Sequence, residues 1–290
     1  MYKTLNSHYR EKFGCKVYKL SVDGGFTCPN RDGKIGTGGC IFCSESGGGE
    51  FAAHGTDILK QLEDAKKRVE KKTRDGKYIA YFQAFTGTYA PIEKLEKMYY
   101  DAISLDFIVG LAVATRPDCL DDDVIALLQE VNAIKPVSVE LGFQTVNEQT
   151  AHYIRRGYEN KVYFDAVKRL KAAGLEVVTH IIIGLEDDGG VSAVETTRAV
   201  VKTGSDGVKF HLLHILKDTD LEREYLSGKI RCLTLPEYAD ILKGCINELP
   251  SGCVVHRITG DGDKKSLVAP LWSADKKCVL NFLSKYLSEE

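Results

Sequence analysis

The sequence has no long apolar run. None of its hydrophobic stretches approaches the roughly 20 residues that a helix needs to span a bilayer. The first residues, Met1 to Asn6, also lack the apolar centre of a secretory signal peptide. We therefore expect a cytoplasmic protein that does not contact a membrane.

The chain also lacks a marked excess of charge of either sign. It has 39 Lys and Arg against 41 Asp and Glu, and the net charge of −2 argues against binding nucleic acid through overall charge. Local basic groups are candidates for such contacts, although each is more commonly solvated surface charge. They are Lys16, Lys19, Arg31 and Lys34 near the cysteine-rich loop, Arg155 with Arg156, and Arg257 with Lys264 and Lys265.

No linker or low-complexity tract divides the 290 residues. Hydrophobic residues make up 43% of the chain and charged residues 28%, which is typical of a soluble globular protein. We expect a single domain over residues 1–290, with a core at about 15–250 and a C-terminal extension at about 251–290.

Disulfide bonds are not expected, although the chain has nine cysteines, because a reducing cytosol keeps thiols free. Six cysteines are scattered, and we expect them to be small core residues. These are Cys15, Cys119, Cys232, Cys245, Cys253 and Cys278.

The other three cysteines are grouped close to the N-terminus. Eleven residues separate Cys28 from Cys40, and two separate Cys40 from Cys43. The loop between them is rich in glycine and polar residues, so its backbone can wrap around a compact group. Three thiolates are one short of the four that normally close a cubane iron–sulfur cluster, so one iron would be open to another ligand. Two alternatives are a zinc site with His54 as the fourth ligand and a redox dithiol.

Short apolar runs alternate with amphipathic segments along most of the chain. Runs of this length, rich in β-branched and aromatic residues, predict buried parallel strands. They lie at 17–22, 78–82, 107–113, 137–143, 177–183 and 207–213. Apolar residues at spacings of three and four predict helices at 58–69, 95–103, 124–131, 164–171, 191–201 and 238–245. A further strand at 254–258 and a helix at about 274–287 complete the pattern.

Strand and helix repeat at roughly 30 residues, which predicts βα units joined by right-handed crossovers. About six units fit the chain, fewer than the eight of a closed TIM barrel. We therefore expect an α/β fold: a partial, open (β/α)6 TIM-like barrel with a short C-terminal strand–helix extension. Its chemistry would lie at the carboxyl ends of the strands. Polar residues occur at these positions, namely Gln83, Thr86, Thr115, Arg116, Glu140, Gln144, His180, His211 and His214.

An iron–sulfur loop after the first strand of such a barrel resembles the radical S-adenosylmethionine (SAM) superfamily. The commonest cysteine gaps in that superfamily are three and two residues. The gaps of eleven and two found here resemble the Elongator-catalytic-subunit-like branch, in which the first gap is long. Within that branch, the chain resembles the small bacterial YtqA/YhcC-type group.

Further segments carry the resemblance over roughly residues 15–260. Glu140 to Thr145 resembles the branch's Glu-x-Gly-x-Gln-Ser segment, with Thr in place of Ser. Thr86 matches its Gly-Gly-Thr segment, but Ala84 and Phe85 replace the two glycines. Three more segments resemble the branch: 155–158 its Arg-Gly-His, with Tyr158 in place of His, 180–185 its fifth strand, and 207–228 its sixth strand with the Gly-Thr-x-Leu-rich segment that follows.

The resemblance implies that Cys28, Cys40 and Cys43 ligate a [4Fe–4S] cluster whose open iron binds SAM. Electron transfer from the cluster would cleave SAM to methionine and a 5′-deoxyadenosyl radical, which abstracts a substrate hydrogen. Residues expected to bind SAM are Phe42, Gln83, Thr86, Arg116, Glu140, Gln144 and Arg156. Phe42 would pack near the adenine or shield the cluster.

Several of these residues have a second interpretation. Glu140 would bind SAM or form a structural ion pair with Arg116 or Arg156. Arg suits the SAM carboxylate, but the sequence does not separate Arg156 from Arg155. The predicted catalytic residues His180, Lys209 and His211 would face substrate, although a strand histidine is more often a satisfied core group. Lys209 and His211 share one face of their strand, as do Tyr81 and Gln83 on theirs.

The resemblance also implies a substrate and partners. The group is associated with the C5 side chain of the wobble uridine in tRNA, and its chemistry needs an external electron donor such as flavodoxin or ferredoxin. Because no separate RNA-binding segment is evident, tRNA recognition would need the mouth of the barrel, a dimer or a partner protein such as a second modification enzyme. Two other functions stay open: a radical SAM enzyme acting on a small molecule or a protein, and a zinc-stapled barrel that acts as a binding protein.

Overall fold

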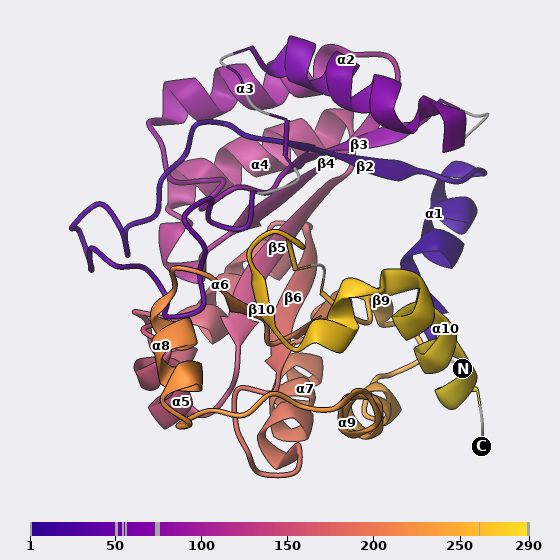
Figure 1. Cartoon of the computed structure of the whole chain (residues 1–290). Coiled ribbons are helices and arrows are strands. Elements are labelled where there is room, and N and C mark those ends of the chain that lie inside the picture. The colour runs from indigo at the N-terminus through magenta and orange to yellow at the C-terminus, as the bar shows by residue number, and fades with distance from the viewer. Residues whose placement is uncertain are drawn as a thin grey trace.

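The computed structural model describes residues 2–49, 52–53, 55, 57–72, 76–260 and 262–288. Within these residues, eight strands form one parallel sheet in the order β1-β9-β7-β6-β5-β4-β3-β2. The sheet curls into an open half-barrel, and Figure 1 shows α2, α3 and α4 along one part of it and α7 and α9 along another. The predicted α/β partial barrel is confirmed.

The strands are β1 (Lys3–Thr4), β2 (Tyr18–Val22), β3 (Tyr78–Phe82), β4 (Ile108–Thr115), β5 (Val137–Gln144), β6 (Glu176–Ile183), β7 (Gly207–Leu212), β8 (Ile215–Leu216), β9 (Val254–Arg257) and β10 (Leu267–Ala269). The α-helices are α1 (Leu5–Phe13), α2 (Ile58–Val69), α3 (Ile92–Ser104), α4 (Asp122–Ile134), α5 (Glu148–Tyr153), α6 (Asn160–Ala172), α7 (Val191–Lys202), α8 (Asp220–Leu226), α9 (Leu235–Asn247) and α10 (Lys276–Tyr286). Each of the six core strands lies where an apolar run predicted it, to within two residues.

Side chains on the two faces of the sheet have different neighbours. On β3, Tyr78 and Phe82 point outward into the main core beneath the helices. Ile79 and Tyr81 alternate with them and point to the inner face, where they pack with Tyr9 of α1. Because both faces of β3 are covered, all five of its residues are buried. Helix α1 thus fills the inner face of the half-barrel below the polar side chains.

The C-terminal part of the chain contributes to the sheet itself. Strand β9 pairs in parallel with both β7 and β1, so it extends the half-barrel beyond its sixth strand. The β8–β10 pair forms a separate antiparallel ribbon just after β7. Among the described residues, no helix has both the length and the apolarity required to cross a membrane.

Candidate active site at the carboxyl ends of the strands

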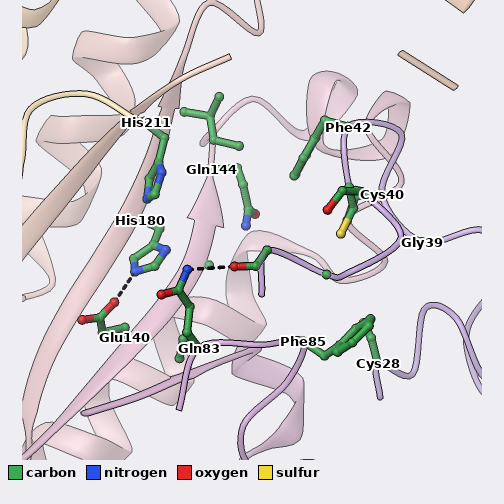
Figure 2. Close-up of a pocket in the computed structure, with 18 of the residues that line it drawn as sticks. Cys28, Gly39, Cys40, Phe42, Gln83, Phe85, Glu140, Gln144, His180 and His211 are labelled. Carbon is green, nitrogen blue, oxygen red and sulfur yellow. Dashed lines mark hydrogen bonds and ion pairs between the residues drawn. The ribbon is translucent and has the colours of Figure 1, made fainter. Parts of the chain in front are cut away.

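A pocket of about 480 Å³ opens at the carboxyl ends of the core strands. The predicted site residues all line it: Cys28, Cys40, Cys43, Phe42, Gln83, Thr86, Arg116, Glu140, Gln144, Arg156, His180, Lys209 and His211. Figure 2 shows Cys28, Cys40 and Phe42 on one side and Glu140, His180 and His211 on the other. Gln83 and Gln144 lie between the two groups. The fold therefore brings together residues that are spread over 184 positions (28 to 211) of the sequence.

The loop after β2 presents the three cysteines to this pocket. A turn joins the last two, with the Cys43 amide donating to the Cys40 carbonyl at 3.0 Å. Burial, together with the neighbouring thiols of Cys43 and Cys28, raises the pKa of Cys40 to about 12. No group of three or more His, Cys, Asp or Glu side chains in the described ranges is arranged to hold a single metal ion. A cluster spreads its thiolates over different iron atoms, so the three thiols need not converge on one point. His54, the expected fourth ligand of the zinc alternative, lies outside the described residues.

Arg31 stabilises the cysteine loop by hydrogen bonds to its backbone carbonyls. Its guanidinium donates to the carbonyl of Cys43 at 3.1 Å and to that of Ser44, and it stacks 5.6 Å from the centre of the Phe85 ring. Gly39, at φ 72°, passes over the same guanidinium, and a Cβ there would lie 2.9 Å from Arg31 Nε. The loop thus requires glycine at this position both for its φ and for its close approach to Arg31.

Glu140 is the centre of a buried polar network on the inner face. Its side chain has no exposed surface, and it accepts from Lys209 at 2.8 Å, from Tyr81 at 2.7 Å and from His180 at 2.8 Å. Lys19 pairs with its other oxygen. The sequence-based alternative of an ion pair with Arg116 or Arg156 is wrong, because the cations that reach Glu140 come from β2 and β7. Lys19, expected in a basic patch near the cysteine loop, points instead into the half-barrel.

Burial and charge shift the pKa values across this network. Burial alone would raise the pKa of Glu140, but Lys19 and Lys209 hold it well below its usual value. Burial lowers the pKa of Lys209 to about 8, against the opposing attraction of Glu140. Burial and the Lys209 charge lower the pKa of His180 to about 4. At neutral pH the network therefore contains a carboxylate, ammonium groups and a neutral imidazole.

Two buried polar atoms of the pocket have no partner within the described part of the chain: Thr86 Oγ1 and His211 Nε2. The Thr86 side chain is 1% exposed. Buried polar groups are normally hydrogen-bonded, so unpaired atoms that line a cavity indicate a place for a ligand. The unpaired atoms of Thr86 and His211, the three cysteine thiols and the volume of the pocket fit a cofactor of the SAM type.

Backbone strain is concentrated beside the same pocket. Phe85 at φ 54° and Gln144 at φ 65° are both in the left-handed region that non-glycine residues rarely adopt. Both line the pocket, and the Gln144 side chain contacts the Tyr158 hydroxyl at 3.4 Å. Such outliers persist where the surrounding structure enforces them, commonly at functional sites.

The two candidate arginines differ in orientation. Arg156 is 1% exposed and lines the pocket, whereas Arg155 points outward and pairs with Asp220 at 2.5 Å. The Arg156 guanidinium donates to the carbonyls of Phe143, Thr145 and Tyr158 at 2.8–3.0 Å. Arg156 is thus the inward residue, but its donors already stabilise the turn after β5.

Arg116 is held in a similar way. It binds Asp118 at 2.8 Å and the Arg156 carbonyl at 3.0 Å.

Sequence reasoning missed Asn30 as a member of the site, placed Lys19 in a basic patch, and named Tyr81 only as sharing a strand face with Gln83. Strand parity with Gln83 was the available signal for Tyr81. Asn30 hydrogen-bonds the Cys40 sulfur and the Arg155 carbonyl, a contact with no local sequence signature.

Comparison with known proteins decides the family. The sequence model of the Radical SAM superfamily matches residues 31–199, and that of the Radical_SAM C-terminal domain matches residues 205–289. The chain belongs to the Radical SAM superfamily. Radical SAM enzymes use a [4Fe–4S] cluster and S-adenosylmethionine. The first match starts three residues after Cys28 and contains Cys40 and Cys43.

Relatives support this assignment along the whole chain. The radical SAM chain is 45% identical to YtqA of Bacillus subtilis (strain 168) over 99% of its length and 89% of YtqA. It is 38% identical to YhcC of Escherichia coli (strain K12), over 96% of its length and 89% of YhcC.

A solved structure, that of archaeal Elp3 from Methanocaldococcus infernus with an N-terminal deletion, has the same fold. The TM-score is 0.67 at 17% identity, over 93% of this chain. The chain spans 63% of that Elp3 chain, and the similarity shows a shared fold alone.

Proposed function

We propose that this radical SAM enzyme modifies the C5 side chain of the wobble uridine in tRNA. The observation that carries the proposal is that one pocket holds the three thiols opposite a buried network of Glu140, Lys209 and His180. The motif resemblance to the Elongator-like branch, the partial similarity to Elongator complex protein 3 and the fold shared with archaeal Elp3 are what favour this substrate.

Cys28, Cys40 and Cys43 would hold the cluster. Thr86, Gln83, Gln144 and the Phe42 ring would hold SAM beside it, with Arg116, Arg156 and Glu140 shaping the wall of the pocket. When bound, the cluster and SAM together supply a 5′-deoxyadenosyl radical that removes a hydrogen atom from the substrate. The residues themselves orient the reacting groups and exclude water from them.

Lys209, His180 and His211 are proposed to face the substrate. Lys209, with its pKa lowered to about 8, still carries a proton at neutral pH and can bind an anionic or carbonyl oxygen of a substrate side chain. His180 is neutral, because burial and Lys209 lower its pKa to about 4. It can therefore accept or donate a hydrogen bond without adding charge.

The pocket also has the charge balance of an anion-binding site. Arg31, Arg116, Arg156, Lys209 and Arg257 line it, against the carboxylates of Glu140 and Asp263 and that of Asp118, which pairs with Arg116. An excess of cations suits a nucleic-acid substrate whose phosphates accompany the base. The proposal includes a cytoplasmic location, an external electron donor such as flavodoxin or ferredoxin, and a partner modification enzyme that acts on the same tRNA.

The test uses protein purified without oxygen and reconstituted with iron and sulfide. It is incubated with dithionite and SAM, with and without bulk tRNA, and 5′-deoxyadenosine and the digested nucleosides are measured by mass spectrometry. We expect tRNA to stimulate 5′-deoxyadenosine formation and to change the mass of a C5-modified uridine. Formation that no tRNA stimulates would contradict the tRNA substrate. Stoichiometric zinc without iron would contradict the radical chemistry.

A further inference from the structure

Asn30 lies next to the cysteines but has no place in the function proposed above. It is the second residue after Cys28, and its side chain is 5% exposed. The backbone of the cysteine loop closes around it, with the Gly39 amide donating to the Asn30 carbonyl at 2.7 Å. A buried amide side chain requires partners for its donors and its acceptor.

The amide nitrogen of Asn30 serves two acceptors. Nδ2 lies 2.6 Å from the Arg155 carbonyl oxygen and 3.7 Å from the Cys40 sulfur, which are hydrogen-bond distances for oxygen and for sulfur. An amide nitrogen carries two N–H bonds, so it can donate to both at once. Among side chains of this size, only asparagine offers this pair of donors on one atom.

The loop is built to keep the amide in this orientation. Gly36 passes over the other end of the side chain, where a Cβ would lie 2.8 Å from Asn30 Oδ1. The Arg155 carbonyl oxygen can only accept a hydrogen bond, so the amide nitrogen and not Oδ1 must face it, and the nitrogen is then also directed at Cys40.

The contact would become stronger when Cys40 binds iron. In the structure the Cys40 sulfur also lies 3.5 Å from the Arg155 carbonyl, to which a thiol can donate. A thiolate bound to iron has no proton to donate, so it becomes only an acceptor. The Arg155 carbonyl then keeps its bond from Asn30, and the second N–H of the same amide faces the negatively charged sulfur.

We propose that Asn30 is a positioning residue that donates a hydrogen bond to the Cys40 thiolate and thereby raises the reduction potential of the cluster. Hydrogen bonds to ligating sulfur are one determinant of cluster potential, because they stabilise the more negative, reduced state. The inference rests on Cys28, Cys40 and Cys43 holding the cluster; it does not depend on the tRNA substrate.

Three variants at this position test the proposal. Asn30→Asp keeps the shape but replaces the donor with an acceptor, Asn30→Ala removes both, and Asn30→Ser keeps one shorter donor. Asn132→Asp is the matched control, because Asn132 lies before β5 and uses its oxygen to accept from the Val137 amide. The readouts are the midpoint potential from an EPR-monitored redox titration and the resonance Raman Fe–S stretch, taken per cluster so that partial loading does not matter.

We expect more negative midpoints and shifted Fe–S stretches in Asn30→Ala and, to a greater degree, in Asn30→Asp, with Asn132→Asp unchanged. Loss of the cluster from Asn30→Ala and Asn30→Asp, with a near wild-type potential in Asn30→Ser, would also support the proposal, because only Asn30→Ser keeps a hydrogen-bond donor. Wild-type midpoints and stretches in Ala and Asp would overturn the proposal, as would loss of the cluster from all three variants. A wild-type protein that binds no iron would instead refute the cysteine ligands.

Discussion

The ammonium group of Lys209 lies 2.8 Å from the carboxylate of Glu140, although β6 separates their strands. His180 of β6 and Tyr81 of β3 bond to the same carboxylate oxygen, and Lys19 of β2 pairs with the other. One buried carboxylate thus connects five strands of the half-barrel in the wall of the pocket.

Removing that charge should weaken the fold. Glu140→Gln leaves Lys19 and Lys209 buried without a counter-ion, and breaking one side of a buried pair costs about 3–5 kcal/mol. Denaturant unfolding measures this loss in free energy. The control is Glu130→Gln, an exposed residue near Tyr100, which should change stability by less than about 0.5 kcal/mol. Equal stabilities of the two variants would contradict the network.

The same carboxylate predicts how stability depends on pH. Burial alone would raise the pKa of Glu140, but Lys19 and Lys209 hold it well below its ordinary value of 4.5. An acid whose pKa is depressed on folding adds stability above its unfolded pKa and loses it as pH falls through the folded pKa. The difference in unfolding free energy between wild type and Glu140→Gln should therefore be full at neutral pH and shrink below pH 4.5. A difference that does not change with acidification would refute this.

Thr86 and Thr88 form a matched pair for testing SAM binding. Thr86 Oγ1 is buried without a partner and lines the pocket, whereas Thr88 Oγ1 bonds the Thr115 hydroxyl at 2.6 Å and the Cys119 carbonyl. Thr86→Val should weaken SAM binding by about 10-fold, one lost hydrogen bond, with little loss of stability. Thr88→Val should instead lower stability by about 1–3 kcal/mol. Calorimetry and thermal unfolding separate the two effects, and unchanged SAM affinity in Thr86→Val would remove Thr86 from the site.

The three pocket cysteines should each be needed for iron. Replacing Cys28, Cys40 or Cys43 with alanine removes one of three ligands, so iron and sulfide content after anaerobic reconstitution should fall to a small fraction of the wild-type value. Cys278→Ser, at an exposed thiol of α10, should keep full loading. Full iron content in any one of the three alanine variants would show that its cysteine is not a ligand.

The sequence predicted the main architecture because buried parallel strands are short continuous apolar runs. The run at 177–183 became β6 and that at 137–143 became β5. Gln144 lies at the carboxyl end of β5 as expected, but Glu140 and His180 lie in the middle of their strands rather than at the ends. Parity along β7 also placed Lys209 and His211 in one pocket, as expected. What depends on local pattern and on strand alternation could therefore be predicted.

What depends on pairing across the fold could not be predicted. Strand β9 was expected near 254–258, but its place between β7 and β1 depends on contacts with the N-terminus. Helix α1 and the β8–β10 ribbon have too few residues to show a clear period. The partners of Glu140 were assigned to the arginines near it in sequence, whereas Lys19 and Lys209 reach it across the inner face.

The central claim is that the three thiols hold a cluster with an iron open to SAM. The most direct measurement is EPR of the anaerobically purified, dithionite-reduced protein with and without SAM, together with iron and sulfide assays. The account predicts about four irons per chain and a reduced-cluster signal that changes when SAM is added. Zinc in place of iron after reconstitution, or a cluster signal that SAM leaves unchanged, would contradict it.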